Sequence, residues 1–173
     1  MDNLPALKGI KVASFCLIAA GPVALRYLAL WGATVVRVES HRSPDLLRLM
    51  TPYKDGKFGL DRNAWFPNVN SSTYSFSIDL NNSNGLELAH QLIEWSDVVV
   101  ENFGPGRMKK WGLDYESVRE ERPDIIYLSS SQLGQTGSYS SYIGYGYQAS
   151  AMAGFTHITG WPDQLPTPYP GAY

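Results

Sequence analysis

Val98-Val99-Val100-Glu101-Asn102-Phe103-Gly104-Pro105-Gly106 is the stretch that decides the fold of this chain. Three consecutive valines predict a short strand that is buried on both faces, as in a parallel sheet. Two polar residues, an aromatic residue and a Gly-Pro-Gly corner follow the valines. Ligands of open α/β sheets bind at the carboxyl ends of the strands, where such corners expose backbone amides. We therefore predict that this corner is part of a binding site.

A second strand and corner lie near the start of the chain. Residues 10–15 predict a strand, Gly21-Pro22 a tight turn, and residues 23–31 a helix too rich in apolar residues to be exposed. The proline suits a first helical turn, and Gly32 suits a helix end. With the strand predicted at residues 35–38, this is a βαβ unit. Taken alone, the Gly-Pro pair would fit an ordinary turn equally well.

Helical and strand patterns continue to alternate, which predicts an α/β fold with a parallel sheet and helices on both faces. Residues 40–73 are broken by proline and glycine, and a loop of this length is typically functional. We expect helices at residues 84–94 and 115–121 and a strand at residues 125–128. The chain from Gly160 is rich in proline and is expected to be extended and packed. The first of these helices is expected to bury Leu86, Leu88, Ala89, Leu92 and Ile93.

Composition narrows the class of protein. The chain has 173 residues, 44% of them hydrophobic, which is enough for one well-buried domain. A net charge of −2 gives no basic surface for nucleic acid, so we expect no nucleic-acid partner. The single Cys16 cannot form an intrachain disulfide and fits a reducing cytoplasm; we expect a small buried residue there, not a nucleophile. No apolar run approaches the length of a membrane span, and we predict neither a membrane partner nor a metal site.

Short motifs follow one another in a fixed order along the chain. They read Leu7-Lys8-Gly9-Ile10-Lys11-Val12, Ala20-Gly21-Pro22, Gly32-Ala33-Thr34-Val35-Val36-Arg37-Val38-Glu39, Ser77-Ile78-Asp79-Leu80, Asp97 to Gly106, Trp111-Gly112-Leu113, Arg122-Pro123-Asp124-Ile125-Ile126-Tyr127 and Gly134-Gln135-Thr136-Gly137. In this order and at these spacings, they closely resemble the family III coenzyme A transferases, the group that contains formyl-CoA and carnitine CoA transferases. The resemblance implies a Rossmann-like sheet and makes residues 1–173 the amino-terminal part of the large coenzyme A-binding domain.

The resemblance also implies an activity. Enzymes of this family move coenzyme A from an acyl-CoA donor to a carboxylic acid acceptor, through an aspartyl anhydride and an enzyme-bound thioester. Coenzyme A is then a substrate and not a permanently bound cofactor, and the protein partner is a second copy in an interlocked homodimer or a heteromeric subunit. The family pattern places the nucleophilic Asp about two positions beyond Tyr173. This chain is therefore expected to contain no catalytic residue and to be inactive alone.

The resemblance assigns coenzyme A contacts to six parts of the chain. An aromatic ring there can pack against adenine or pantetheine, a glycine allows close approach of the backbone, and a lysine can meet a phosphate or the adenine ring. The implied contacts are Ala19, Ala20, Ser40, Ile78, Asp79, Leu80, Asn81, Asn102, Phe103, Gly104, Lys110, Ile143, Gly144, Tyr145 and Gly146.

Some positions depart from the family pattern. Thr73 and Tyr74 stand where most members carry Lys-Arg, and Ser40 stands where many carry an Arg. Phosphate binding would then rely on Arg42, Lys109, Lys110, backbone amides or residues outside this chain. A non-catalytic partner subunit of a heteromeric CoA transferase therefore stays open as an alternative.

Two other classes of protein are disfavoured. Alpha-methylacyl-CoA racemases are similar in sequence but use a His where Tyr145 stands, and an unperturbed Tyr with a pKa near 10 is a poor base at neutral pH. His157 is expected to be a packing residue. A generic nucleotide-binding module would open its first helix with Gly-x-Gly-x-x-Gly, which is absent here.

Overall fold

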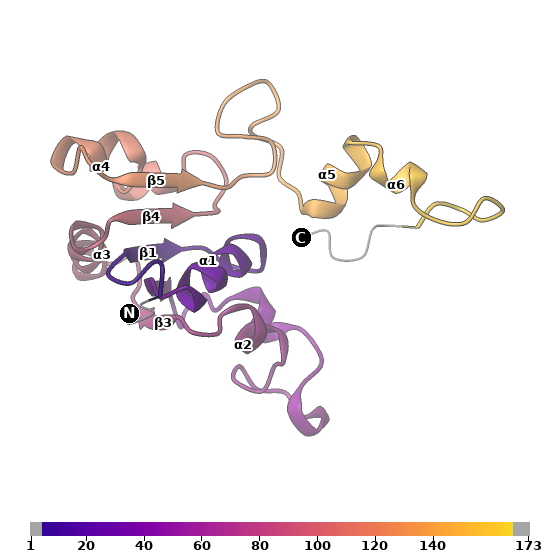
Figure 1. Cartoon of the computed structure of the whole chain (residues 1–173), viewed down its shortest axis with the longest axis horizontal. Helices are drawn as coiled ribbons and strands as arrows, with labels where there is room; N and C mark the ends of the chain where they lie inside the picture. The colour runs from indigo at the N-terminus through magenta and orange to yellow at the C-terminus, as the bar shows by residue number, and fades with distance from the viewer. Residues whose placement is uncertain (1–4, 168–173) are drawn as a thin grey trace. The chain divides into compact units, whose positions relative to one another are not determined.

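The computed structural model describes residues 5–167, which divide into two compact units at Ser130. The first unit is built on a five-stranded sheet in the order β3-β2-β1-β4-β5, and every neighbouring pair of strands is parallel. Figure 1 shows β4 and β5 side by side with their arrowheads pointing the same way. The strands are β1 (Lys11–Phe15), β2 (Thr34–Glu39), β3 (Tyr74–Ser77), β4 (Val98–Glu101) and β5 (Ile126–Ser129).

The order of the strands creates a topological switch point. From β1 the chain moves outward through β2 to β3, and it then returns to the other side of β1 to form β4 and β5. The connections from the two central strands, β1 and β4, therefore lead in opposite directions. In open α/β sheets the ligand site lies at such a point, outside the carboxyl ends of the strands.

Helices cover both faces of the sheet, as predicted. Leu25 packs with Val100 on one face, whereas Ala89 and Val118 pack with Val99 on the other. Because side chains alternate along a strand, the successive valines of β4 enter two separate cores, which confirms a strand that is buried on both faces. The helices are α1 (Ala20–Leu30), α2 (Trp65–Val69), α3 (Ser83–Trp95) and α4 (Tyr115–Glu121), with 3₁₀ turns η1 (Leu46–Leu49), η2 (Lys54–Gly56) and η3 (Met108–Trp111).

Gly32 ends α1 as the sequence predicts. Its φ of 103° lies in the region that glycine tolerates best, and its N–H donates to the Ala29 carbonyl at 3.0 Å. The Ala33 N–H donates to the Leu28 carbonyl at 3.1 Å, which completes a Schellman motif. This stop turns the chain back into β2.

Three expectations for the first unit need correction. Strand β3 was not predicted, because only Phe76 of its four residues packs against the core. Leu88 was expected in the buried stripe of α3 but is 40% exposed, since Leu86, Ala89, Leu92 and Ile93 already fill the core side. The segment 40–73 is not wholly irregular, because it contains α2 and two short 3₁₀ turns.

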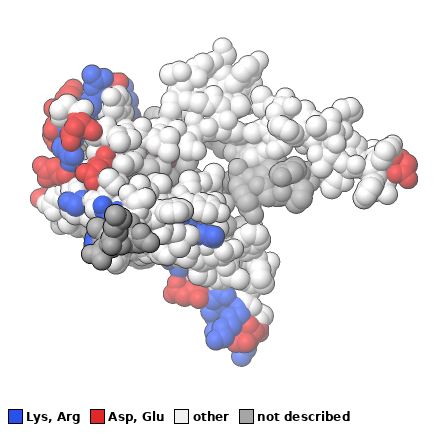
Figure 2. Space-filling view, in the orientation of Figure 1, with Lys and Arg blue, Asp and Glu red and all other residues white. Residues whose placement is uncertain are grey.

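The second unit, described for residues 131–167, contains the short helices α5 (Gly146–Met152) and α6 (Phe155–Ile158), neither of which was predicted. Residues 160–167 form no helix, as expected, but they are exposed and not packed. Asp163 is the only Asp, Glu, Lys or Arg after residue 130, and Figure 2 shows the charged side chains gathered mainly on the first unit. None of the described helices is both long and apolar enough to cross a membrane.

Candidate functional site

A cavity of about 370 Å³ lies at the carboxyl ends of β1 to β4 in the first unit. Its walls come from the segments that follow four different strands, which is the position expected for a ligand site at a switch point. The lining residues are Phe15, Leu17, Val38, Glu39, Ser40, Arg42, Ser43, Ile78, Asp79, Leu80, Asn81, Phe103, Arg107 and Trp111.

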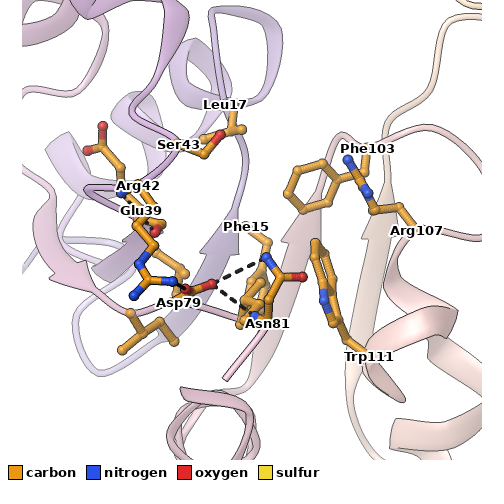
Figure 3. Close-up of a pocket in the computed structure, with 14 residues that line it drawn as sticks. Phe15, Leu17, Glu39, Arg42, Ser43, Asp79, Asn81, Phe103, Arg107 and Trp111 are labelled. Atoms are coloured by element: carbon orange, nitrogen blue, oxygen red, sulfur yellow. Dashed lines mark hydrogen bonds and ion pairs between the residues drawn. The ribbon is translucent and has the colours of Figure 1, made fainter. Parts of the chain in front are cut away.

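One wall of this pocket is aromatic and cationic. The rings of Phe103 and Trp111 meet edge to face with centroids 5.6 Å apart, and the Arg107 guanidinium lies 5.6 Å from the centroid of the Trp111 ring. Figure 3 shows these three side chains together on one side of the pocket. No carboxylate of the described residues lies within ion-pair distance of Arg107. An arginine beside aromatic rings can stack on a flat ring system and pair with a phosphate.

The opposite wall is polar and held in place by a close helix contact. One carboxylate oxygen of Asp79 accepts from the Asn81 N–H at 3.0 Å, and the other lies 3.6 Å from Arg42 (Figure 3). Helix α3 starts directly beneath this wall: a Cβ on Gly85 would lie 2.1 Å from the Asp79 carbonyl oxygen. Only glycine allows this approach without displacing the wall.

Glu39 marks the end of β2 and is the centre of an ionic network. Its carboxylate accepts from Arg37 at 2.7 Å, from Arg48 at 2.8 and 3.0 Å and from the Asp45 N–H at 2.9 Å. Burial raises the pKa of Glu39, but the hydrogen bonds from Arg48, the Asp45 backbone and Arg37 outweigh it and lower the pKa to about 2. Glu39 is therefore a fixed anion at neutral pH and not a general base.

The turn between β1 and α1 closes another edge of the site. Gly21, predicted in a tight turn, lies in the first turn of α1 and packs closely against this segment, since a Cβ on Gly21 would lie 2.4 Å from the Cys16 Sγ. Burial raises the pKa of Cys16 to about 12, against a hydrogen bond with Ser14. The prediction that Cys16 is a small buried residue is confirmed, since a neutral buried thiol is a poor nucleophile.

Asn102 braces the same turn from the end of β4. Its Oδ1 accepts from the Leu17 N–H at 2.8 Å, and its Nδ2 donates to the Leu17 carbonyl at 2.8 Å. The neighbouring Glu101 accepts from the Phe103 N–H at 2.7 Å, and burial raises the pKa of this carboxyl against hydrogen bonds with Ser129 and Phe103. The corner after the valines is thus held by the polar side chains that end the strand.

Comparison with known proteins agrees with this geometry. The sequence matches CoA-transferase family III over residues 7–172. The chain belongs to this family. It is 38% identical to the succinate–glutarate CoA-transferase of Agrobacterium fabrum, over 95% of this chain and 42% of that protein. It is 33% identical to the succinyl-CoA–L-malate CoA-transferase alpha subunit of Chloroflexus aurantiacus, over 95% of this chain and 38% of that protein.

A solved structure shares the fold of this family III chain. The crystal structure of a CAIB/BAIF family protein from Brucella suis superimposes with a TM-score of 0.88 at 35% identity, over 96% of this chain and 44% of that one. The chain thus spans less than half the length of the relatives it matches.

The contacts implied by the family resemblance fall into three groups. Ser40, Ile78, Asp79, Leu80, Asn81 and Phe103 line one pocket. Ala19 is buried, Ala20, Gly104 and Lys110 are exposed outside the pocket lining, and the Asn102 side chain holds Leu17. The remaining contacts, Ile143, Gly144, Tyr145 and Gly146, precede or begin α5 in the second unit. Their roles in coenzyme A binding stay predictions.

Arg107 and Trp111 line the pocket although the sequence reasoning did not select them. Lys110, the basic contact that the family resemblance implies for this segment, lies in η3 outside the pocket lining; Arg107 and Lys110 are both exposed. The sequence offered no periodic signal for them: η3 is a 3₁₀ turn, in which residues three apart share a side, and Arg107 and Trp111 are four residues apart.

Proposed function

We propose that the complete protein transfers coenzyme A from an acyl-CoA donor to a carboxylic acid, and that the pocket at the switch point binds coenzyme A. The wall formed by Phe103, Trp111 and Arg107 is the observation that carries this proposal. Coenzyme A combines a flat adenine ring with phosphate groups, and this wall offers aromatic surface and a cation without a carboxylate partner among the described residues.

The pocket offers a place for each end of the molecule. Adenine packs against Phe103 and Trp111, and the phosphates lie toward Arg107 and Arg42. Arg42 is three-quarters exposed, so its side chain has room to move toward a phosphate. The pantetheine arm then follows Leu17 toward the turn that precedes α1. In this arrangement Arg107 and Arg42 take the role of the Lys-Arg pair that most family members carry at the positions of Thr73 and Tyr74.

The chemistry follows the family mechanism. A carboxylate expected beyond Tyr173 attacks the thioester carbonyl of the donor, forms an anhydride and releases the coenzyme A thiolate. The thiolate attacks the aspartyl carbonyl of the anhydride, which releases the donor acid and leaves an enzyme thioester. The acceptor carboxylate then attacks this thioester to form a new anhydride, and the thiolate returns to the acceptor carbonyl.

The acid is proposed from the relatives. The relatives named above act, by their names, on succinate, glutarate and malate, so we propose a dicarboxylic acid as acceptor. The many Tyr and Trp residues of the chain leave an apolar or aromatic acid open as an alternative. A panel of succinyl-CoA with glutarate, malate and benzoate as acceptors separates these choices.

A second candidate is a non-catalytic partner subunit of a heteromeric transferase. The alpha subunit among the relatives and the lost basic residues favour it. The sequence of the coding region past Tyr173 separates the two, because an Asp about two positions on supports catalysis and its absence supports a partner role.

Calorimetric titration of the complete protein with coenzyme A tests the pocket. Trp111→Ala and Phe103→Ala are expected to weaken binding about tenfold each, the loss typical of one stacking ring. The losses of coenzyme A affinity in Arg107→Ala and Lys110→Ala are also compared. Arg107 lines the pocket, whereas Lys110 is the basic contact that the family pattern selects. Lys8→Ala is the matched control, since Lys8 is exposed, lies outside the pocket lining and is not among the expected phosphate contacts. Unchanged affinity in both aromatic variants would place coenzyme A elsewhere.

A further inference from the structure

Ile18 adopts a backbone conformation that its side chain disfavours. Its φ is 63°, in the left-handed region, and it stands in the turn between β1 and α1. A β-branched residue is a genuine outlier there, because Cβ comes too close to the following carbonyl oxygen. Such a conformation persists only where the surroundings hold it, and it is often found at functional sites.

Asp45 supplies that hold. Its carboxylate is fully buried, and its Oδ2 accepts from the Ile18 N–H at 2.9 Å and from Arg37 at 2.6 Å. Its Oδ1 accepts from the Leu47 N–H at 2.9 Å, and its own N–H donates to Glu39 at 2.9 Å. Four hydrogen-bond partners, Ile18 among them, thus fix the position of Asp45.

The turn is also a wall of the pocket. Leu17, which lines the cavity, immediately precedes Ile18. The Asn102 side chain forms hydrogen bonds of 2.8 Å with both the Leu17 N–H and the Leu17 carbonyl. Asn102 comes from the end of β4, and Asp45 comes from the loop after β2. Two side chains from opposite sides of β1 therefore determine the conformation of one short turn.

We propose that Asp45 is a positioning residue of the pocket: by holding the Ile18 N–H it keeps the turn left-handed and fixes the Leu17 wall against the ligand. Asp45 does not touch the ligand and acts through the turn. The identity of the ligand rests on the proposed function, whereas the hold on the turn does not.

A double-mutant cycle in the complete protein tests this role with coenzyme A as the probe. Asp45→Asn is expected to weaken coenzyme A binding about tenfold, the effect of losing a hydrogen bond to a charged group. In an Ile18→Gly background the same change is expected to cost about twofold or less, because glycine adopts positive φ without steric penalty. An equal loss in both backgrounds would show that Asp45 acts through general stability and would overturn the proposal.

Asp61→Asn is the matched control. Asp61 is an exposed member of the same ionic network, 2.5 Å from Arg48, and it does not contact the turn. Its removal is expected to leave coenzyme A affinity and the turn unchanged. An effect as large as that of Asp45→Asn would assign the result to the network as a whole and count against the proposal.

Amide hydrogen exchange of the peptide that contains residues 16–19 gives a readout that needs no ligand. Leu17 and Ile18 lie outside every strand and helix, yet their N–H groups are expected to exchange slowly in the wild-type protein. Asp45→Asn is expected to speed exchange of Ile18, and Asp61→Asn is not. Fast exchange in the wild-type protein would overturn the proposal even if Asp45→Asn fails to fold. If the wild-type protein binds no coenzyme A, the proposed function fails while the exchange data still decide the role of Asp45.

Discussion

The ends of strands β2 and β4 look alike in sequence but differ in electrostatics. Each strand runs from valines into a buried glutamate at its last position: Glu39 is 9% exposed and Glu101 is 3% exposed. The pKa of Glu39 is lowered to about 2, because hydrogen bonds from two arginines and a backbone N–H outweigh burial. The pKa of Glu101 is raised by burial, against hydrogen bonds with Ser129 and Phe103. The same strand-end residue is therefore stabilised as an anion at the end of β2, whereas at the end of β4 burial works against its charge.

The difference comes from the segments that follow the strands. After β2 the chain supplies Asp45 and Arg48 within ten residues, and Arg37 stands two positions before Glu39 on the same face of the strand. After β4 the chain makes a Gly-Pro-Gly corner, and Glu101 itself caps that corner through the Phe103 N–H. At the end of β2, ion pairs thus hold a long loop in place. At the end of β4, a short corner forms part of the pocket wall.

Among the variants that compare the two strand ends, Arg37→Met should cause the largest loss in the free energy of unfolding. It removes the buried partner of both Glu39 and Asp45 and leaves their charges partly unpaired. We expect a loss of about 3–5 kcal/mol in the free energy of unfolding of the complete protein, measured by urea denaturation. Arg119→Met is the control, because this exposed arginine pairs with Glu116 three residues away and should cost less than about 0.5 kcal/mol. Equal losses in both variants would show that the ion pairs of Arg37 do not stabilise the end of β2.

Glu39→Gln and Glu101→Gln form a matched pair that sharpens the comparison. At pH 7, Glu39→Gln is expected to cost about 2–3 kcal/mol, because two arginines lose a shared anion. Glu101→Gln is expected to cost less than Glu39→Gln, because burial works against the Glu101 charge and an amide oxygen can still accept from the Phe103 N–H. Urea midpoints of the two variants at pH 7 decide this, and a larger loss from Glu101→Gln would reverse our assignment of the two ends.

Asn102→Ala tests the β4 end through the turn that it braces. The change leaves the Leu17 N–H and carbonyl without their side-chain partners, at an expected cost of about 1–2 kcal/mol. Asn102→Asp is the matched control, because a carboxylate can still accept from the Leu17 N–H but cannot donate to its carbonyl. Thermal unfolding should rank the three proteins wild type, Asn102→Asp, Asn102→Ala. An Asn102→Ala protein as stable as the wild type would show that Leu17 needs no brace.

The sequence was sufficient for the parts of the fold that valines and glycines determine. Dense apolar runs that alternate with sharp stops such as Gly32 predicted β1, β2, β4, β5, α1 and α3 close to their observed bounds. The short helix α4 was also predicted, although Val118 is its only buried residue. Strand β3 was not predicted because it lies at a sheet edge and three of its four residues are exposed. Helices α5 and α6 were not predicted because they bury no residue, so they have no apolar stripe to reveal them.

The site was predictable in position but only partly in composition. The corner after β4 and the segment 78–81 were expected to bind a ligand, and the structure brings Phe103 and Asp79 to one pocket. The family pattern selected Lys110, whereas Arg107 lines the pocket, because which of the neighbouring basic residues faces it depends on how η3 turns. The opposite pKa shifts of Glu39 and Glu101 also depend on residues brought close only by folding, above all Arg48 nine positions away.

The pH dependence of stability should show the smallest effect. The pKa of Glu39 is about 2 in the folded protein and near 4.5 when unfolded, so the unfolded state binds more protons as the pH falls. The stability that Glu39 contributes is therefore present above about pH 5 and declines toward pH 2, by about 0.7 kcal/mol between pH 5 and pH 4. The pKa of Glu101 is raised, so the folded state holds its proton more tightly and acidification favours folding at that site. Urea titrations at pH 5 and pH 4 should thus show a flatter pH dependence for Glu39→Gln than for the wild type and a steeper one for Glu101→Gln. If both variants change the slope in the same direction, the two strand ends do not differ in the way their contacts indicate.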